Sequence, residues 1–217
     1  YCFQSFVNTM KSNKLIKNKR LCLLDLDKTC FYMNKSGQTF ECEYYSNLIK
    51  NNTKIIDFRN GITYGEYNQE SGVVAVINTN EHDPTKFMWF HWYIRPYLFE
   101  LLMYIYKNNC DIVITTMGKD LYAKVARYII KHFVCHSKIE IKGVLSKSYW
   151  NTCFAKQSCT KQKYKSVDKV LESYPEYKLN DTFIIDDDYL FWVPTYNKNN
   201  GVLLFNLKEY INDIDRP

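Results

Sequence analysis

Short apolar runs recur along the chain, and segments of helical periodicity separate most of them. Continuous apolar runs of this length are typical of strands that are buried on both faces of a parallel sheet. Strands that alternate with helices are joined by right-handed crossovers, so the pattern predicts an α/β fold. The five expected strands are residues 21–26, 111–115, 139–144, 182–185 and 202–205.

Helices are expected where apolar residues recur at helical spacing, at residues 96–108, 120–133, 167–174 and 207–214. Residues 30–92 break the alternation, because they are rich in Tyr, Asn, Thr and Gly and carry alternating apolar pieces at 73–77 and 87–93. This pattern predicts β-hairpins inserted after the first strand. We therefore expect a single domain over residues 1–217, with a β-hairpin insertion at about 30–92.

The composition is that of a globular protein with a core, since 46% of the residues are hydrophobic and 24% are charged. No stretch approaches the ~20 apolar residues of a membrane helix, so no membrane partner is expected. The net charge of +6 arises from 24 Lys and only 5 Arg. This excess of Lys favours acidic or phosphorylated substrates, and it leaves direct nucleic-acid binding open. A solvated lysine-rich surface is the ordinary alternative.

Eight cysteines are present, but a chain of this size does not need disulfides to fold, and the spacing favours an intracellular protein. Cys22 and Cys110 adjoin apolar runs, so we expect them in the core. Zinc binding by Cys135 or by the pair Cys153 and Cys159 is disfavoured, because the chain has no C-x-x-C knuckle.

Acidic residues follow two of the expected strands. Asp25 and Asp27 end the first, and Asp186, Asp187 and Asp188 follow the fourth. Ligands of open parallel sheets bind at the carboxyl ends of the strands. Buried carboxylates at such a place need a cation, and oxygen ligands favour Mg²⁺. With a hydroxyl pair after the second strand and a lysine before the fourth, these groups predict a phosphoryl-transfer site.

Four motifs follow one another between residues 21 and 192. They are Asp25-Leu26-Asp27-Lys28-Thr29, Thr116-Met117-Gly118 with Tyr122-Ala123, Lys165-Ser166, and Ile185-Asp186-Asp187 with Trp192. In type and order they resemble the motifs of haloacid dehalogenase (HAD) superfamily phosphatases, in particular the FCP/SCP branch. That branch comprises the NLI-interacting-factor-like relatives of the RNA polymerase II C-terminal-domain phosphatases. The resemblance implies a HAD-like Rossmannoid three-layer fold with a central parallel sheet and a β-rich insertion after the first strand.

The resemblance also implies catalytic roles. Asp25 would be the nucleophile that forms an aspartyl-phosphate, and Asp27 would be the general acid and then the general base. Thr116 would donate a hydrogen bond to the phosphoryl oxygens, and Lys165 would neutralise charge on the nucleophile and the phosphoryl group. Thr29 would steady the loop that carries both aspartates.

Magnesium is the cofactor that the resemblance implies. The Asp25 carboxylate, the Asp27 backbone carbonyl and the Asp187 carboxylate would hold Mg²⁺, while Asp186 would pair with Lys165. A metal at this place reduces the repulsion between an anionic nucleophile and an anionic substrate.

Several of these residues have an ordinary structural alternative. An aspartate at a strand end is often a cap or turn residue, and Thr116 is also a candidate cap of the following helix. Lys165 lies in a lysine-rich stretch, with Lys163 as the alternative for the third motif. Trp192 is interpreted as part of the core or of a groove wall.

The function expected from the resemblance is Mg²⁺-dependent hydrolysis of phosphoserine or phosphothreonine in a protein, in an intracellular, nuclear setting. The composition, rich in Lys, Asn and Tyr, also fits a large DNA virus. A viral relative such as the baculovirus HAD-like protein of nucleocapsid assembly is one version of the resemblance. The corresponding partners would be a basic DNA-packaging protein or the RNA polymerase II tail. The alternatives are a nucleic-acid 3′-phosphatase and a non-catalytic peptide-binding scaffold of the same fold.

Overall fold

The computed structural model describes residues 19–40, 54–57, 62–68, 73–80, 83–155, 165–192 and 203–206. The chain forms two compact units. The first unit comprises Tyr1–Thr29 and Tyr97–Glu209, and the second comprises Cys30–Pro96 and Tyr210–Pro217. The extent of a single functional domain over residues 1–217 remains a prediction.

A five-stranded parallel sheet forms the centre of the first unit, with strand order β10-β9-β1-β7-β8. Every neighbouring pair in it is parallel, which confirms the predicted α/β fold. Strand β1 therefore lies between β9 and β7, and its Leu24 pairs with Ile185 on one side and Ile114 on the other. The strands are β1 (Arg20–Leu24), β7 (Cys110–Thr115), β8 (Ile141–Leu145), β9 (Thr182–Asp186) and β10 (Leu203–Asn206).

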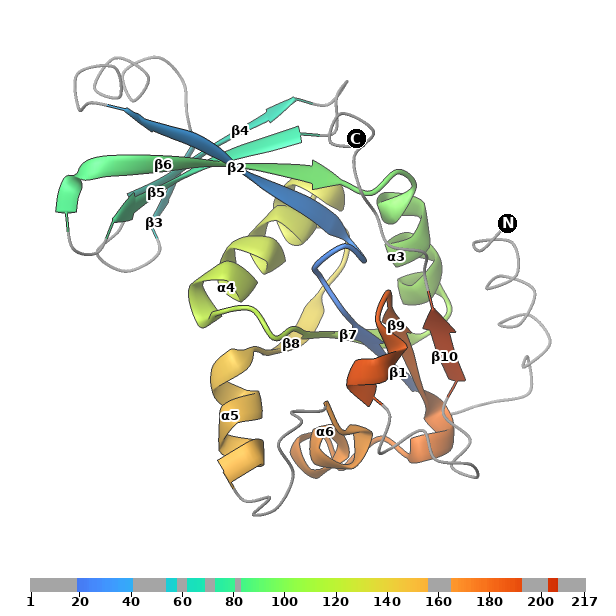
Figure 1. Ribbon diagram of the computed structural model, residues 1–217. Helices are drawn as coiled ribbons and strands as arrows, with labels where there is room; N and C mark the ends of the chain where they lie inside the picture. Colours follow the sequence, from blue (N-terminus) through green and yellow to red (C-terminus); the bar gives the residue numbers. More distant parts are fainter. Residues whose placement is uncertain are drawn as a thin grey trace. The chain divides into compact units, whose positions relative to one another are not determined.

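Helices cover both faces of this sheet (Figure 1). Helices α3 (Leu98–Lys107) and α4 (Asp120–Tyr128) lie on one face, and α5 (Lys147–Ala155) and α6 (Val167–Ser173) lie on the other. The first unit thus has three layers, as the family resemblance implies. Short 3-10 turns precede and follow β9, at Leu179–Asp181 and Tyr189–Trp192.

The helices differ from the sequence prediction at three places. The helix expected over 120–133 ends as an α-helix at Tyr128 and continues as a π-helix, Ile129–Val134, which buries both of its isoleucines. Helix α5 was not predicted, because its aromatic residues, Asn and Thr are weak helix formers without an apolar stripe. The closing helix expected over 207–214 lies outside the described residues.

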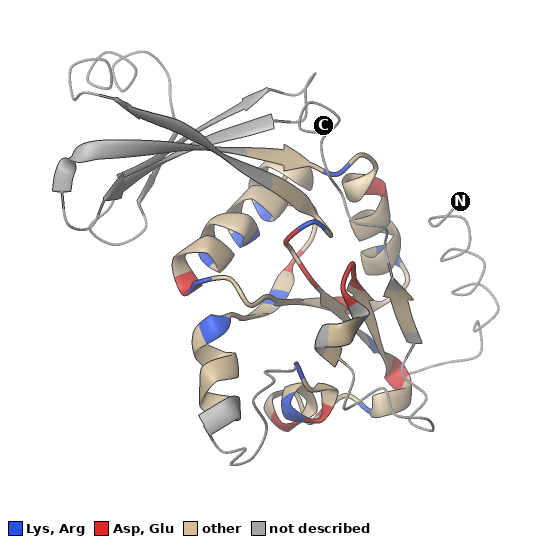
Figure 2. Ribbon diagram, in the orientation of Figure 1, with Lys and Arg blue, Asp and Glu red and all other residues tan. Residues whose placement is uncertain are grey.

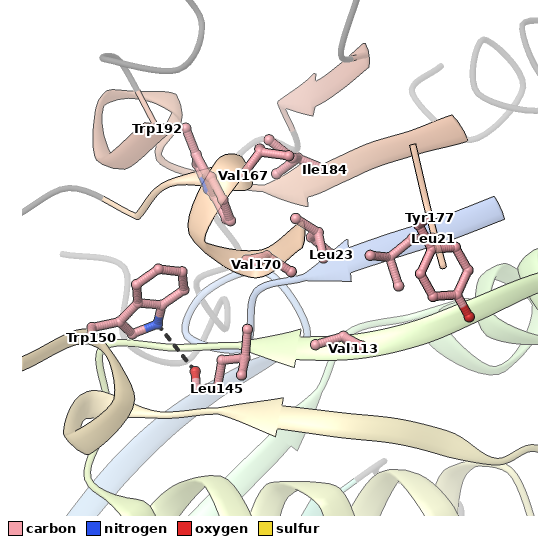
Figure 3. Packing of buried hydrophobic residues seen from close by; sticks show 10 residues of the cluster. All are labelled: Leu21, Leu23, Val113, Leu145, Trp150, Val167, Val170, Tyr177, Ile184 and Trp192. Atoms are coloured by element: carbon pink, nitrogen blue, oxygen red, sulfur yellow. Dashed lines mark hydrogen bonds between the residues drawn. The ribbon is translucent and has the colours of Figure 1, made fainter. Parts of the chain in front are cut away.

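Side chains of alternate strand residues build the core between the sheet and the α5–α6 layer (Figure 3). Leu21 and Leu23 of β1 belong to this cluster, so the intervening Cys22 is buried on the opposite face. Trp150 fixes α5 by donating its indole N–H to the Leu145 carbonyl at 3.2 Å. The full cluster is Leu21, Leu23, Val113, Leu145, Trp150, Val167, Val170, Tyr177, Ile184 and Trp192.

The second unit is an antiparallel sheet with strand order β2-β6-β5-β4-β3. It agrees with the β-rich insertion predicted for residues 30–92, and Trp92 packs edge-to-face on Phe31 inside it. The strands are β2 (Phe31–Phe40), β3 (Lys54–Asp57), β4 (Ile62–Asn68), β5 (Val73–Asn80) and β6 (Asp83–Ile94). Among the residues that the structure describes, no helix has the length and apolarity of a membrane span.

Candidate active site

The candidate site lies at the carboxyl end of the parallel sheet, where β1 ends between its two neighbours. Asp25 follows β1 directly, and its backbone N–H donates to the Ile185 carbonyl of β9 at 2.9 Å. Strand β9 ends at Asp186, and acidic residues gather at both strand ends (Figure 2). Because the three central strands run parallel in register, residues more than 150 positions apart in sequence converge on one point.

Lys165 lies between the groups that meet at these strand ends. Its ammonium group donates to Asp25 Oδ1 at 2.5 Å, to Asp186 Oδ2 at 2.9 Å and to the Thr115 carbonyl at 3.2 Å. The residue is only 1% exposed, so these contacts replace its hydration. The structure thereby places the lysine expected in the third motif beside both aspartates, while Lys163 lies outside the described residues.

The charges of this cluster shift one another's protonation. Removal from water raises the pKa of the Asp25 carboxyl well above its ordinary value, and Lys165 offsets only part of that shift. Burial alone would lower the pKa of Lys165, but Asp25 and Asp186 outweigh burial and hold it above the usual range. Lys165 therefore stays protonated in contact with both carboxyl groups.

Asp186 is held through both of its carboxylate oxygens. Oδ2 accepts from Lys165 and, at 2.7 Å, from the indole N–H of Trp192, while Oδ1 accepts the Asp188 backbone N–H at 2.9 Å. The Lys165 ammonium also lies 5.3 Å from the centre of the Trp192 ring. Trp192 is fully buried, so it belongs to the core, as expected, and it also fixes the carboxylate that faces the lysine.

Thr29 fixes the neighbouring carboxylate. Its hydroxyl donates to Asp187 Oδ1 at 2.8 Å and accepts the Asp187 backbone N–H at 2.9 Å. Thr29 itself is buried at the end of the loop that carries Asp25 and Asp27. This reciprocal pair ties the loop after β1 to the loop after β9. The loop-steadying role expected for Thr29 stays a prediction.

The donor set fits a hard divalent cation. Asp25, Asp186 and Asp187 each place one carboxylate oxygen within 4.8 Å of the other two. The three carboxylates exceed the single positive charge of Lys165, and oxygen-only ligands of this kind are those that Mg²⁺ prefers. The Asp27 carboxylate is not in this group, and the expected contribution of the Asp27 backbone carbonyl stays a prediction.

Asp27 is set apart from the buried cluster. Its carboxylate is exposed, and Oδ1 accepts a short hydrogen bond from the Tyr122 hydroxyl on α4. Partial loss of water raises the pKa of Asp27, although the hydrogen bond from Tyr122 and the charges of Lys165 and Lys28 oppose the shift. A carboxyl with a raised pKa, here next to the buried Asp25, has the property that a general acid needs.

Thr116 lies where β7 ends, fully buried. Its backbone N–H donates to the Leu145 carbonyl at 2.9 Å, and its hydroxyl accepts the Gly118 N–H at 2.9 Å. The following helix begins only at Asp120, with Lys119 at its N-cap, so Thr116 closes the turn before that helix and does not cap the helix. Its expected contact with phosphoryl oxygens remains a prediction.

Two contacts of the site were not predicted from the sequence, those of Tyr122 with Asp27 and of Trp192 with Asp186. Tyr122 and Trp192 both belong to the motifs of the sequence analysis, and this is the one feature of the sequence that could have indicated a place in the site. The disfavoured zinc site has no support among the described residues, where the single group able to hold a metal is the aspartate cluster. Of the cysteines considered for zinc, Cys135 is a buried free thiol, and Cys159 lies outside the described part of the chain.

Residues 20–215 match the profile of the NLI interacting factor-like phosphatases. The chain belongs to this family. Its members are HAD-type hydrolases of phosphoric monoesters. The buried Asp–Lys–Asp cluster lies at the carboxyl ends of the strands, where ligands of open parallel sheets bind. A comparison with curated proteins gives no match.

Solved structures give distant similarities. Fission yeast RNA polymerase II CTD phosphatase Fcp1 bound to beryllium fluoride shares 15% identity and a TM-score of 0.44, covering 87% of this chain and 42% of that chain. A second structure of Fcp1, an essential RNA polymerase II CTD phosphatase, shares 16% identity and a TM-score of 0.42, with the same coverage. The chain thus spans less than half the length of these two proteins. The family assignment rests on the profile match.

Proposed function

We propose that this NLI interacting factor-like phosphatase is a Mg²⁺-dependent enzyme that hydrolyses phosphoserine or phosphothreonine in a protein substrate. The observation that carries the proposal is the buried contact of Lys165 with Asp25 and Asp186 at the end of β1. A protonated lysine there holds a carboxylate at the place where a phosphoryl group would be attacked. The motif resemblance supports phosphoserine and phosphothreonine as the substrate class.

In the first half of the reaction, a carboxylate oxygen of Asp25 attacks phosphorus and forms a new P–O bond. The bond from phosphorus to the serine or threonine oxygen breaks, and its electron pair stays on that oxygen. The Asp27 carboxyl gives its proton to this oxygen, so the leaving group departs as a neutral hydroxyl. Lys165 and Thr116 offset the charge that develops on the phosphoryl oxygens.

In the second half, a water molecule attacks the aspartyl-phosphate on Asp25. The Asp27 carboxylate removes a proton from this water, whose oxygen bonds to phosphorus, while the bond to Asp25 breaks. The products are phosphate, the restored Asp25 carboxylate and a protonated Asp27. Each aspartate therefore ends the cycle in the state in which it began.

Asp25, Asp187 and the Asp27 carbonyl would hold Mg²⁺, with Asp186 turned towards Lys165 and Trp192. When bound, the ion supplies positive charge that reduces repulsion between the Asp25 carboxylate and the substrate phosphate. Thr29 contributes by holding Asp187 in place.

The biological setting follows from the resemblance and is part of the proposal. The RNA polymerase II tail is one phosphorylated substrate of the expected kind, and a basic DNA-packaging protein in viral nucleocapsid assembly is the other. Either substrate would place the protein in a nucleus. The net charge of +6 favours approach of a phosphorylated, acidic segment through long-range attraction.

The experiment is turnover of p-nitrophenyl phosphate with Mg²⁺, with EDTA, and by the Asp25→Asn variant. We expect metal-dependent turnover that Asp25→Asn abolishes. Asp111→Asn is the matched control, because Asp111 lies near the opposite end of β7 and should leave turnover unchanged. Absence of turnover in a folded, Mg²⁺-loaded protein would contradict the proposal and favour the scaffold.

A second comparison separates the substrate classes. Phosphoserine peptides and a 3′-phosphorylated oligonucleotide are offered to the active protein at several salt concentrations. We expect hydrolysis of the peptides. Preferential release of phosphate from the oligonucleotide, with binding that weakens steeply as salt rises, would instead identify a nucleic-acid 3′-phosphatase.

A further inference from the structure

The hydroxyl of Tyr122 donates to Asp27 Oδ1, although the two residues are separated by 95 positions in the chain. We propose that Tyr122 is a positioning residue that holds the Asp27 carboxyl in the orientation needed to protonate the leaving oxygen. This inference rests on the proposed function, because it assigns Tyr122 a part in the step that Asp27 performs.

Asp27 needs such a partner because of its place in the loop. It is exposed, whereas Asp25 beside it is buried, and the next residue, Lys28, has a left-handed backbone with φ of 57°. An exposed carboxylate on a loop samples several rotamers, and each of the others would turn the acid away from the leaving group. One hydrogen bond from a fixed donor removes much of this freedom.

The hydrogen bond also distinguishes the two carboxylate oxygens. Because Oδ1 accepts from Tyr122, the proton that Asp27 transfers is carried by Oδ2. The Tyr122 hydroxyl therefore selects which oxygen faces the leaving group, beyond limiting rotation of the side chain. Selection of one carboxylate oxygen in this way acts on the proton-transfer step and not on substrate binding.

Tyr122 is mounted rigidly enough for this task. It lies in the first turn of α4, where Asp120 Oδ1 accepts the Ser146 hydroxyl at 2.5 Å and the Ser148 N–H at 3.4 Å. These bonds fasten the start of α4 to the chain that follows β8. A donor on an anchored helix holds its acceptor more precisely than a donor on a loop.

Gly118 makes room for the Tyr122 ring. A Cβ atom at position 118 would lie inside contact distance of that ring and 3.2 Å from Thr116 Oγ1. The Gly118 carbonyl also accepts the Lys147 N–H at 2.9 Å, so the turn cannot easily move away. The spacing from Gly118 to Tyr122 thus places the tyrosine ring directly against the glycine.

The ordinary alternative is a structural bond that ties α4 to the loop, and the leaving group separates the two roles. A general acid matters most when the leaving oxygen is strongly basic and matters little when it is already a good leaving group. If Tyr122 is a positioning residue, the fall in kcat/KM on its removal should therefore increase with the basicity of the leaving group. If the bond is only structural, its removal should lower kcat/KM for all substrates by the same factor.

The test measures kcat/KM for dinitrophenyl, p-nitrophenyl and phenyl phosphate, since kcat/KM reports the first half of the reaction. We expect Tyr122→Phe to lower kcat/KM about tenfold for phenyl phosphate and less than about twofold for dinitrophenyl phosphate. Asp27→Asn should show the same trend more steeply. Tyr149→Phe is the matched control, because it also removes a tyrosine hydroxyl bond, to the Lys169 carbonyl, and should change no ratio.

Two further variants keep the inference falsifiable if Tyr122→Phe is unstable. Gly118→Ala should displace the ring and reproduce the dependence on the leaving group. Adding Tyr122→Phe to Asp27→Asn should lower kcat/KM no further, because the two act through one group. A uniform loss across the three esters, or an additive double variant, would overturn the inference. Turnover that does not depend on Asp25 would instead overturn the proposed function.

Discussion

Thr29 and Asp187 exchange two hydrogen bonds across 158 positions of the chain. The threonine hydroxyl donates to the carboxylate at 2.8 Å and accepts the aspartate's own backbone N–H at 2.9 Å. A carboxylate so fixed is prepared to bind a cation, because its orientation need not be ordered when the ion arrives. We therefore expect the threonine of the first motif to act on the proposed metal site, and to affect Asp25 only indirectly.

Thr29→Val should weaken Mg²⁺ binding, because valine has nearly the same shape and lacks the hydroxyl. We expect the Mg²⁺ concentration for half-maximal turnover to rise about tenfold, with turnover largely restored at high Mg²⁺. Thr29→Ser keeps the hydroxyl and is the control. The prediction fails if the Mg²⁺ dependence of Thr29→Val equals that of the wild type.

Lys165→Met should abolish turnover and destabilise the metal-free protein. The change leaves Asp25 and Asp186 buried without their ammonium partner, which costs on the order of 3 kcal/mol in the free energy of unfolding. Urea denaturation in EDTA measures it. Lys169→Met, which removes only the ion pair with Glu172, should have little effect on either quantity. Equal stability of the two variants would contradict the account of the buried cluster.

The location of the site was predictable because parallel strands place their ends together. Once residues 21–26 and 182–185 are assigned to strands of one parallel sheet, Asp25 and Asp186 are expected at the same edge of that sheet. The choice between Lys165 and Lys163 was less secure, since both lie in a lysine-rich stretch and local sequence gives no distance. The structure places the Lys165 ammonium 2.5 Å from Asp25, a contact set by tertiary packing.

The remaining differences have local causes. Strand β1 ends at Leu24, two residues before the end of the strand predicted over 21–26. The prediction is too long because Leu26 is apolar and buried, as a strand residue would be, but lies in the loop. Helix α5 has little helical signal and is held by the Trp150 indole. The bond from Tyr122 to Asp27 joins a helix to a loop, and no periodicity encodes such a pairing.

Asp111→Asn should lower stability without loss of turnover, with a defined pH dependence. Burial alone would raise the pKa of Asp111, but hydrogen bonds from Lys19, Tyr177 and Lys142 outweigh it and lower the pKa. A lowered folded-state pKa means that the ionised form stabilises the fold above the unfolded value of about 3.9, and that this contribution disappears as pH falls through the folded value.

We therefore expect wild type to exceed Asp111→Asn by about 1 kcal/mol in unfolding free energy at neutral pH, with the difference vanishing in acid. Urea denaturation over a pH series measures it. Lys19 Nζ lies 2.7 Å from Asp111 Oδ1, so high salt should reduce part of the difference. A difference that stays constant down to strongly acidic pH would show that charge is not its source.

Trp192→Phe should reduce turnover by removing one donor to Asp186. The indole N–H donates to Oδ2 at 2.7 Å, and this is the oxygen that also accepts from Lys165. Phenylalanine keeps an aromatic ring against Trp150, whose ring centroid lies 6.2 Å from that of Trp192, but it removes one of the three donors that hold the Asp186 carboxylate. We expect kcat to fall about threefold to tenfold, with a loss of about 1–2 kcal/mol in unfolding free energy.

Trp150→Phe is the control for this prediction. Trp150 is equally buried in the same cluster, and its N–H donates to the Leu145 carbonyl, away from the aspartates. Both variants lose the same atoms from one core, so their unfolding free energies should fall by similar amounts. Only Trp192→Phe should change kcat, because only its N–H reaches the carboxylate that faces Lys165. Equal loss of kcat in both variants would mean that the core as a whole, and not the bond to Asp186, supports the site.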